Sequence, residues 1–122
     1  MSTPTGTNPL PAYTIPLTPA VKAAYLDLYN KIQAGLNSTM DLATVQALNQ
    51  AWPQIDQVLD ENDEYAMSQD TNIFASLQKQ IKSTNDGLTQ LRSQITAIAS
   101  HFSMAADILA AIDKVFTVIT SA

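Results

Sequence analysis

The chain contains no cysteine, which excludes disulfide bonds, thiolate metal ligands and thiol nucleophiles. It has one histidine, His101, and a lone imidazole without cysteine cannot make a closed zinc site. His101 is also the only plausible base for nucleophilic catalysis, and no serine stands in a GxSxG context. We therefore interpret His101 as a packed or half-exposed structural residue. The three glycines, Gly6, Gly35 and Gly87, are isolated, so no glycine-rich phosphate loop is present. These absences predict a protein that is not an enzyme, with no catalytic residues, metal, cofactor or small-molecule substrate.

Charge is scarce, and positive charge especially so. Charged residues make up 14% of the chain, and six scattered cations leave a formal net charge of −5. Binding to nucleic acid depends on clustered Lys and Arg, because they release counterions from the phosphates, so we expect no nucleic acid partner. An EF-hand loop counted from the start of the run DENDE would need glycine and an acid where Tyr65 and Thr71 stand. We interpret the run as a solvated acidic patch of four residues: Asp60, Glu61, Asp63 and Glu64.

Proline is concentrated at the start of the chain, where residues 1–17 hold four of the six. Each proline fixes its own φ and favours extended geometry in its predecessor, so this segment is predicted to be an extended or disordered tail before a helical domain at 18–122. No cation precedes Lys22, and no apolar core of signal-peptide length is present. We expect a cytoplasmic protein, or one exported without a cleaved signal, of bacterial or phage origin.

Two helices are predicted in the first part of that domain. Thr18 is a good N-cap and Pro19 suits the first helical position, so one helix begins there and ends near Gly35. Ser38 or Thr39 is expected to cap a second helix, with Asp41 in its first turn, where the helix dipole favours an anion. Pro53 lies inside the second apolar pattern and predicts a kink near 49–53 or two shorter helices. Cap and turn residues predict its end around 68–72.

A third helix is predicted over 72–120, because apolar residues alternate at spacings of three and four through that region. Gly87 is its weak point, and a break there is the alternative. We expect an all-α fold: an elongated antiparallel bundle or coiled-coil hairpin of three helices, or four if Gly87 interrupts the last. In that hairpin the acidic run would lie alongside Lys79 and Lys82.

The two halves of this third helix differ in how much apolar surface they carry. The first half has polar flanks, which suit one partner helix, whereas the second half has a broad apolar face that suits two or more. We predict a contact surface there, made of eight residues: Ile98, Phe102, Ile108, Leu109, Ile112, Val115, Phe116 and Ile119. Residues 95–119 have the length of a membrane span, yet their back is polar, so membrane contact is expected only after conformational change or oligomerisation.

The function favoured by these patterns is that of a non-enzymatic interaction or assembly protein, which self-associates or binds a protein partner through helix packing. Subunits of bacterial secretion, phage or toxin assemblies fit this description. A membrane-active, pore-forming type of toxin component is the first alternative. The second is a small acidic inhibitor or immunity-type protein that docks a basic partner through the acidic patch.

Overall fold

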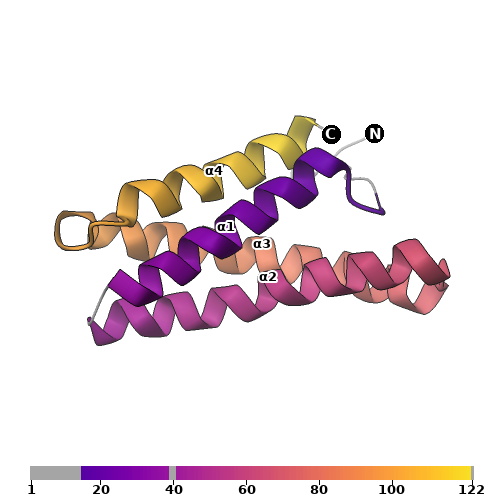
Figure 1. Ribbon diagram of the computed structural model, residues 1–122, viewed down its shortest axis with the longest axis horizontal. Coiled ribbons are helices and arrows are strands. Elements are labelled where there is room, and N and C mark those ends of the chain that lie inside the picture. Colours follow the sequence, from indigo (N-terminus) through magenta and orange to yellow (C-terminus); the bar gives the residue numbers. More distant parts are fainter. Residues whose placement is uncertain (1–14, 39–40, 122) are drawn as a thin grey trace.

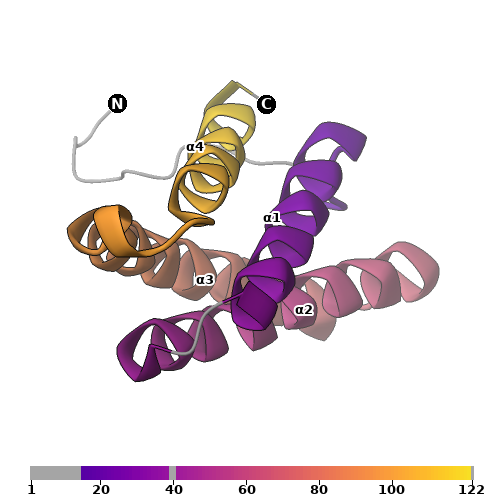
Figure 2. The same ribbon diagram turned by 60° about the vertical axis from the view of Figure 1, so that its left-hand side comes forward.

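The computed structural model of the protein describes residues 15–38 and 41–121, and the regular secondary structure of these residues is helical. The four α-helices are α1 (Pro19–Ser38), α2 (Leu42–Ser68), α3 (Thr71–Ala97) and α4 (Ala105–Ser121). Successive helices run in opposite directions, and each packs against two neighbours: α1 and α3 both contact α2 and α4 (Figure 1). Figure 2 shows the four helices around a common interior. The prediction of an all-helical fold is confirmed.

Thr18 caps α1 as predicted: its side-chain oxygen accepts the Val21 N–H at 3.3 Å, and its carbonyl accepts the Lys22 N–H at 2.9 Å. The predicted start of α2 was wrong. Asp41 is its N-cap, and its carboxylate accepts from both the amide (2.9 Å) and the hydroxyl (2.7 Å) of Thr44. Ser38 still belongs to α1, because Gly35 is buried in the interior and does not end the helix.

The predicted tail falls in two parts. Residues 1–14 lie outside the described residues, so most of that prediction is untested. Residues 15–17 pack against the bundle: Leu17 is buried, and its N–H donates to Asn62 Oδ1 at 2.7 Å. This bond gives the buried Asn62 side chain of α2 a hydrogen-bond partner, and it holds the segment that precedes α1 against α2.

Helix α2 is continuous over 27 residues, so of the two alternatives predicted at Pro53 the pair of shorter helices was wrong, and a kink stays a prediction. Proline has no N–H to offer Asn49, but both residues are exposed on the outer face of α2, where water can take the place of the missing donor. Helix α2 ends within the predicted range. Gln69 adopts a left-handed conformation (φ 58°) and donates its N–H to Tyr65, and Asp70 then caps α3.

The prediction of a single long C-terminal helix was also wrong. Helix α3 runs unbroken through Gly87, but it ends at Ala97, and a short 3-10 turn and an extended Phe102 reverse the chain into α4. Ser100 and Ser103 lie in this connection, where their hydroxyls suit turns. The reversal interrupts a few helical hydrogen bonds, each with a net contribution of roughly 0.5–1.5 kcal/mol.

The packing of α4 against the bundle stabilises the fold by more free energy than the loss of these hydrogen bonds costs. It buries four large apolar side chains, each stabilising by roughly 1.5–3 kcal/mol: Ile108, Ile112, Val115 and Ile119. A straight helix would leave them in water.

The interior contains a polar pair among apolar side chains. Tyr25 of α1 donates its hydroxyl to Asn85 Oδ1 of α3 at 2.7 Å, and both residues are almost fully buried. Asn85 Nδ2 is buried without a hydrogen-bond partner among the described residues. Polar flanks were expected on this half of the helix, whereas Asn85 is buried against α1.

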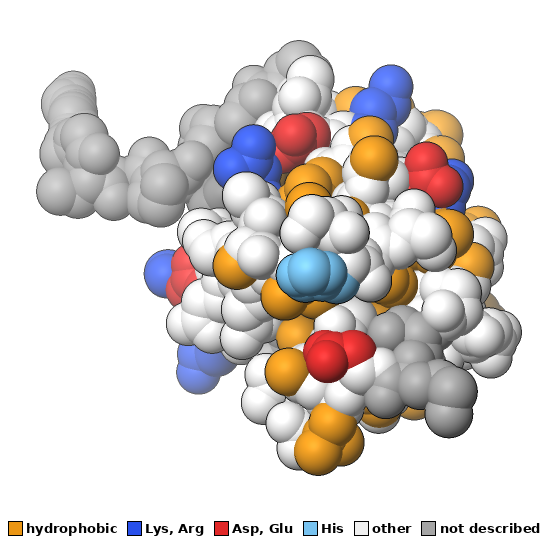
Figure 3. Space-filling view, turned by 90° about the vertical axis from the view of Figure 1, so that its left-hand side faces the viewer, with side chains coloured by type: hydrophobic (Ala, Val, Ile, Leu, Met, Phe, Trp, Pro, Cys, Tyr) orange, Lys and Arg blue, Asp and Glu red, His pale blue; other side chains and the backbone are white. Residues whose placement is uncertain are grey.

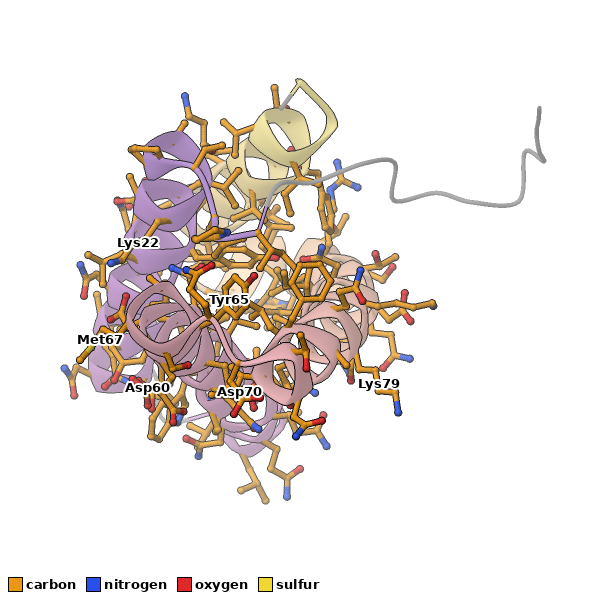
Figure 4. The ribbon with its side chains drawn as sticks, turned by 90° about the vertical axis from the view of Figure 1, so that its right-hand side faces the viewer. Lys22, Asp60, Tyr65, Met67, Asp70 and Lys79 are labelled. Carbon is orange, nitrogen blue, oxygen red and sulfur yellow. The ribbon has the colours of Figure 1, made fainter. Side chains whose placement is uncertain are left out.

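Ion pairs do not follow the predicted register. Asp63 of the acidic patch pairs with Lys22 of α1 at 2.9 Å, and Lys82 pairs with Asp86 on its own helix. Figure 4 shows Lys79 on the opposite side of the hairpin from Asp60. Asp63 therefore lies toward α1, which the sequence pattern did not predict.

Candidate functional site

The predicted contact surface on residues 98–119 is mostly interior. Phe102, Ile108, Ile112, Val115 and Ile119 are buried, and the remaining three are half-buried against the core: Ile98, Leu109 and Phe116. Because α4 packs against both α1 and α3, the broad apolar face is covered within one chain. Intramolecular packing accounts for its apolarity, and a contact role for these residues stays a prediction that requires α4 to move.

A groove that is open to solvent lies instead between α2 and α3. Three adjoining hollows of about 290, 230 and 120 Å³ form it, and we call them together the α2–α3 groove. The first two share Ala47 and Gln94, and the second and third share Thr44 and Ile98. The groove therefore follows the seam between the two helices from Gln54 to the loop after α3.

The side chains that line this groove are small, apolar or carry an amide. Helix α2 lines it with Ala43, Thr44, Ala47, Gln50, Ala51 and Gln54. Helix α3 and its cap line it with Gly87, Gln90, Leu91, Gln94, Ile95, Ala97 and Ile98. Four glutamine side chains thus surround the largest hollow, and apolar side chains line the middle one.

Formal charge is missing from the walls of the groove over most of its length. Residues 42–55 of α2 include no charged side chain. Between Asp86 and His101 the only charged residue is Arg92, whose Nε donates to Asp113 of α4 at 2.8 Å. This ion pair raises the pKa of the Arg92 guanidinium and holds the side chain toward α4.

Charge returns at one end of the groove, where Asp41, His101 and Phe102 line the smallest hollow. Hydrogen bonds from the hydroxyl and then the amide of Thr44 lower the pKa of Asp41, and the nearby His101 lowers it slightly further. Figure 3 views the molecule from the end that carries this single histidine. His101 is exposed rather than packed or half-exposed, and a structural role for it stays a prediction.

The acidic patch does not act as one surface. Asp60, Asp63 and Glu64 are exposed, but Glu61 is half-buried and accepts the hydroxyl of Ser76 at 3.0 Å. Glu61 therefore bridges α2 to α3, and only the other three carboxylates face solvent. Met67, 88% exposed, lies on the same part of the hairpin as Asp60 (Figure 4).

Within the described residues, no group of three or more His, Asp or Glu side chains is placed to hold a metal ion. None of the described helices combines the length and apolarity needed to cross a membrane.

No protein-family model, curated protein or solved structure matches the chain.

Sequence reasoning missed the groove, although three signals for it were present. Ala43, Ala47 and Ala51 recur every fourth residue, residues 42–55 lack charge, and Gly87 stands inside a helical pattern. Each signal has an ordinary structural explanation by itself. Only the packing of α2 on α3 brings the alanines, the glutamines and the glycine to one seam.

Proposed function

We propose that this protein is a non-enzymatic interaction protein whose α2–α3 groove binds a helical segment of a protein partner. The observation that carries this proposal is Gly87, a glycine in the middle of a 27-residue helix that lines the groove. Glycine at such a position destabilises a helix by about 1 kcal/mol relative to alanine. A glycine at this position therefore needs a structural or functional explanation.

The fold itself does not supply that reason. A Cβ at Gly87 would meet only the end of the Gln54 side chain, with Oε1 at 2.7 Å, and that flexible amide can turn away. Gly35 is different: a Cβ there would lie 3.0 Å from both Ile108 Cδ1 and Phe102 Cζ, in the core. The interior thus requires Gly35 but not Gly87. Glycine also serves where another molecule approaches the backbone closely, and the groove supports that role for Gly87.

The dimensions and chemistry of the groove suit a helix. Residues 41–54 span about 20 Å of α2, which is close to four helical turns. Small residues allow two helix backbones to approach closely, and interfaces are depleted of charge at their centres. Helix-in-groove binding uses such a seam, with apolar contacts along the floor and polar groups at the rim.

Site-specific photo-cross-linking in the native host tests this proposal. A photoreactive residue at Gln90 should give a discrete cross-linked species, and the same residue at exposed Asn30 on α1 should not. Gly87→Leu should abolish the species because leucine fills the largest hollow, whereas Gly87→Ala should retain most of it. Equal cross-linking from both positions, or none from Gln90, would refute the proposal.

A specific observation also favours a second candidate, the docking of a cationic partner on α2. Asp56, Asp60 and Glu64 repeat every fourth residue toward the C-terminal end of the helix, which has no basic residue in its last turn. Like charges at this spacing destabilise a helix by roughly 0.2–0.5 kcal/mol per pair, and the helix dipole adds to the effect. In the described part of the chain, none of the three has an ion-pair partner.

Neutralising Asp60 and Glu64 together tests the second candidate. Asp60→Asn with Glu64→Gln should raise the free energy of unfolding slightly and weaken binding of a lysine-rich amphipathic peptide in a salt-dependent way. Asp27→Asn with Asp86→Asn is the control, because it removes equal charge from two other faces. If the control variant loses peptide binding to the same degree, net charge alone is responsible and the candidate fails.

A further inference from the structure

We infer that the connection between α3 and α4 is a hinge, and that α4 of one chain can take the place of α4 in a second copy. In this exchange α3 and α4 join into one continuous helix, and two chains form a two-fold dimer. The inference is independent of the α2–α3 groove and of its occupant. It gives the apolar residues of α4 the contact role that the sequence predicted, through the movement of α4 that such a role requires.

The connection lacks the residues that normally end a helix. Residues 98–104 read IASHFSM, with no proline, and with no glycine to adopt a left-handed conformation after α3. Ile98, the C-cap of α3, has φ −112° and ψ 12°, next to the helical region. The chain departs from a helical path at Phe102, which is extended with φ −129° and ψ 111°. Each of these residue types is compatible with a helix, so the connection can become helical without strain.

The turn between α2 and α3 is built differently. Gln69 adopts a left-handed conformation there, and the hydroxyl of Ser68 accepts the Asp70 N–H at 3.2 Å. The carboxylate of Asp70 then caps α3 by accepting the Asn72 N–H at 2.8 Å. In the described residues 98–102, by contrast, no side chain caps the 3-10 turn that follows α3. Local contacts therefore fix the first reversal of the hairpin, whereas packing alone holds the second.

The apolar pattern keeps one phase across the connection. Four residues continue the spacing of three and four through it: Ile95, Ile98, Phe102 and Ala105. A continuous helix therefore places them on one face, in line with the stripes of α3 and α4. Joining the helices also gives partners to the backbone groups that two helix ends leave without one. The connection lies at one end of the bundle, with its histidine on the outer face, so the continuous helix leaves the bundle without crossing it (Figures 1 and 3).

The buried side chains of α4 determine which molecule receives this helix. Four large apolar residues must leave water again when α4 leaves its own bundle: Ile108, Ile112, Val115 and Ile119. A second copy offers a complementary site, because its own α4 packs against the same surfaces of α1 and α3. The 2.8 Å ion pair between Arg92 and Asp113 then forms again between chains. Exchange of an identical element is a low-cost route to a dimer.

Substitution of Ser103 can lock or loosen the hinge. Ser103 follows the extended Phe102, and it is the second residue of a turn in which the Ala105 N–H donates to the Phe102 carbonyl at 3.0 Å. Both features suit proline, so Ser103→Pro should leave the monomer folded. In a continuous helix, proline removes a hydrogen bond and clashes with the preceding turn.

Sedimentation equilibrium, with each sample refolded at its final concentration, measures the effect on association. We expect a monomer–dimer equilibrium in the wild type. Ser103→Pro should raise its dissociation constant by roughly a hundredfold or more, because each dimer contains two hinges. Ser103→Ala, at the same position, should lower the constant by roughly fivefold, because alanine favours the continuous helix.

Arg92→Cys combined with Asp113→Cys identifies the chain that supplies α4, because the protein has no other cysteine. The double substitution removes the same ion pair from the monomer and from the dimer. A short bismaleimide should link the two thiols within one chain in the monomer fraction. In the dimer fraction it should link them between chains, which gives a two-chain product in denaturing electrophoresis.

Three outcomes would overturn the inference. The first is that the wild type and Ser103→Ala both stay monomeric at every concentration. The second is a dimer whose thiols are linked only within chains, and the third is a dimer that Ser103→Pro leaves equally tight, because the contact then lies elsewhere. If the proline variant does not fold, Ser103→Ala and the cross-link decide between exchange of α4 and another contact.

Discussion

Two glycines in the interior of helices should respond in opposite ways to the same substitution. Gly35 of α1 and Gly87 of α3 both gain helix propensity when alanine replaces them, by about 1 kcal/mol each. Their surroundings differ, because the new methyl group enters the core at Gly35 and the solvent-open groove at Gly87. The pair therefore separates a glycine that packing requires from one that it does not.

The magnitudes follow from the nearest atoms. At Gly35 the new Cβ would lie 3.0 Å from Ile108 Cδ1 and Phe102 Cζ and 3.2 Å from Leu48 Cδ1, so three buried side chains must shift. Overpacking of this kind costs roughly 1–3 kcal/mol, which outweighs the propensity gain and leaves a net loss of about 1 kcal/mol. At Gly87 only the Gln54 amide must turn, so most of the 1 kcal/mol gain should remain.

Urea unfolding followed by circular dichroism measures both variants against the wild type. We expect Gly87→Ala to raise the free energy of unfolding by about 1 kcal/mol and Gly35→Ala to lower it by a similar amount. The reasoning is refuted if Gly87→Ala is destabilising. In that case the packing of α2 on α3 would itself require glycine, and the groove would lose its main support.

Three further predictions concern polar contacts. Tyr25→Phe removes the 2.7 Å bond to buried Asn85 and should cost about 1–3 kcal/mol in urea unfolding; an unchanged midpoint would contradict the buried pair. Gln69→Gly relieves the left-handed residue between α2 and α3 and should raise the free energy of unfolding by about 1 kcal/mol; a loss would show that the glutamine side chain outweighs the strain. The pKa of Asp41 is lower in the folded than in the unfolded protein. Its ionised form therefore stabilises the fold at pH values above its pKa in the unfolded chain, and this stabilisation is lost as the pH falls through its pKa in the folded protein. Asp41→Asn, which retains a capping oxygen, should therefore flatten the loss of stability below about pH 4, and an unchanged acid profile would argue against the Thr44 contacts.

The apolar spacing predicted the helical class, but it did not reveal the chain reversal after α3. Ile95, Phe102 and Ala105 are all buried, and Ile98 packs against the core, so the apolar alternation continues across a connection that is not helical. Apolar periodicity indicates which side chains face the interior. In a short loop that reverses the chain, every third or fourth side chain can still face the interior, so the periodicity does not show that the helix has ended. The serines of the connection were the available signal, and they are weak turn formers by themselves.

The candidate site was less predictable than the fold for the same reason. The excess apolar surface of residues 98–119 predicts a contact face, whereas α1 and α3 cover it once the chain folds back. Sequence alone shows how much apolar surface must be buried, not which neighbour buries it. The groove became visible only when residues 43–54 of α2 and 87–97 of α3 lay side by side.

The most direct test of the groove as a binding surface is the yield of the Gln90 cross-link in Gly87→Leu relative to Gly87→Ala. Both substitutions remove the helix cost of glycine, so both proteins should be at least as stable as the wild type. Only leucine fills the largest hollow. Binding of a partner in the groove predicts a near-complete loss of the adduct in Gly87→Leu and its retention in Gly87→Ala. Equal yields in the two variants would contradict it.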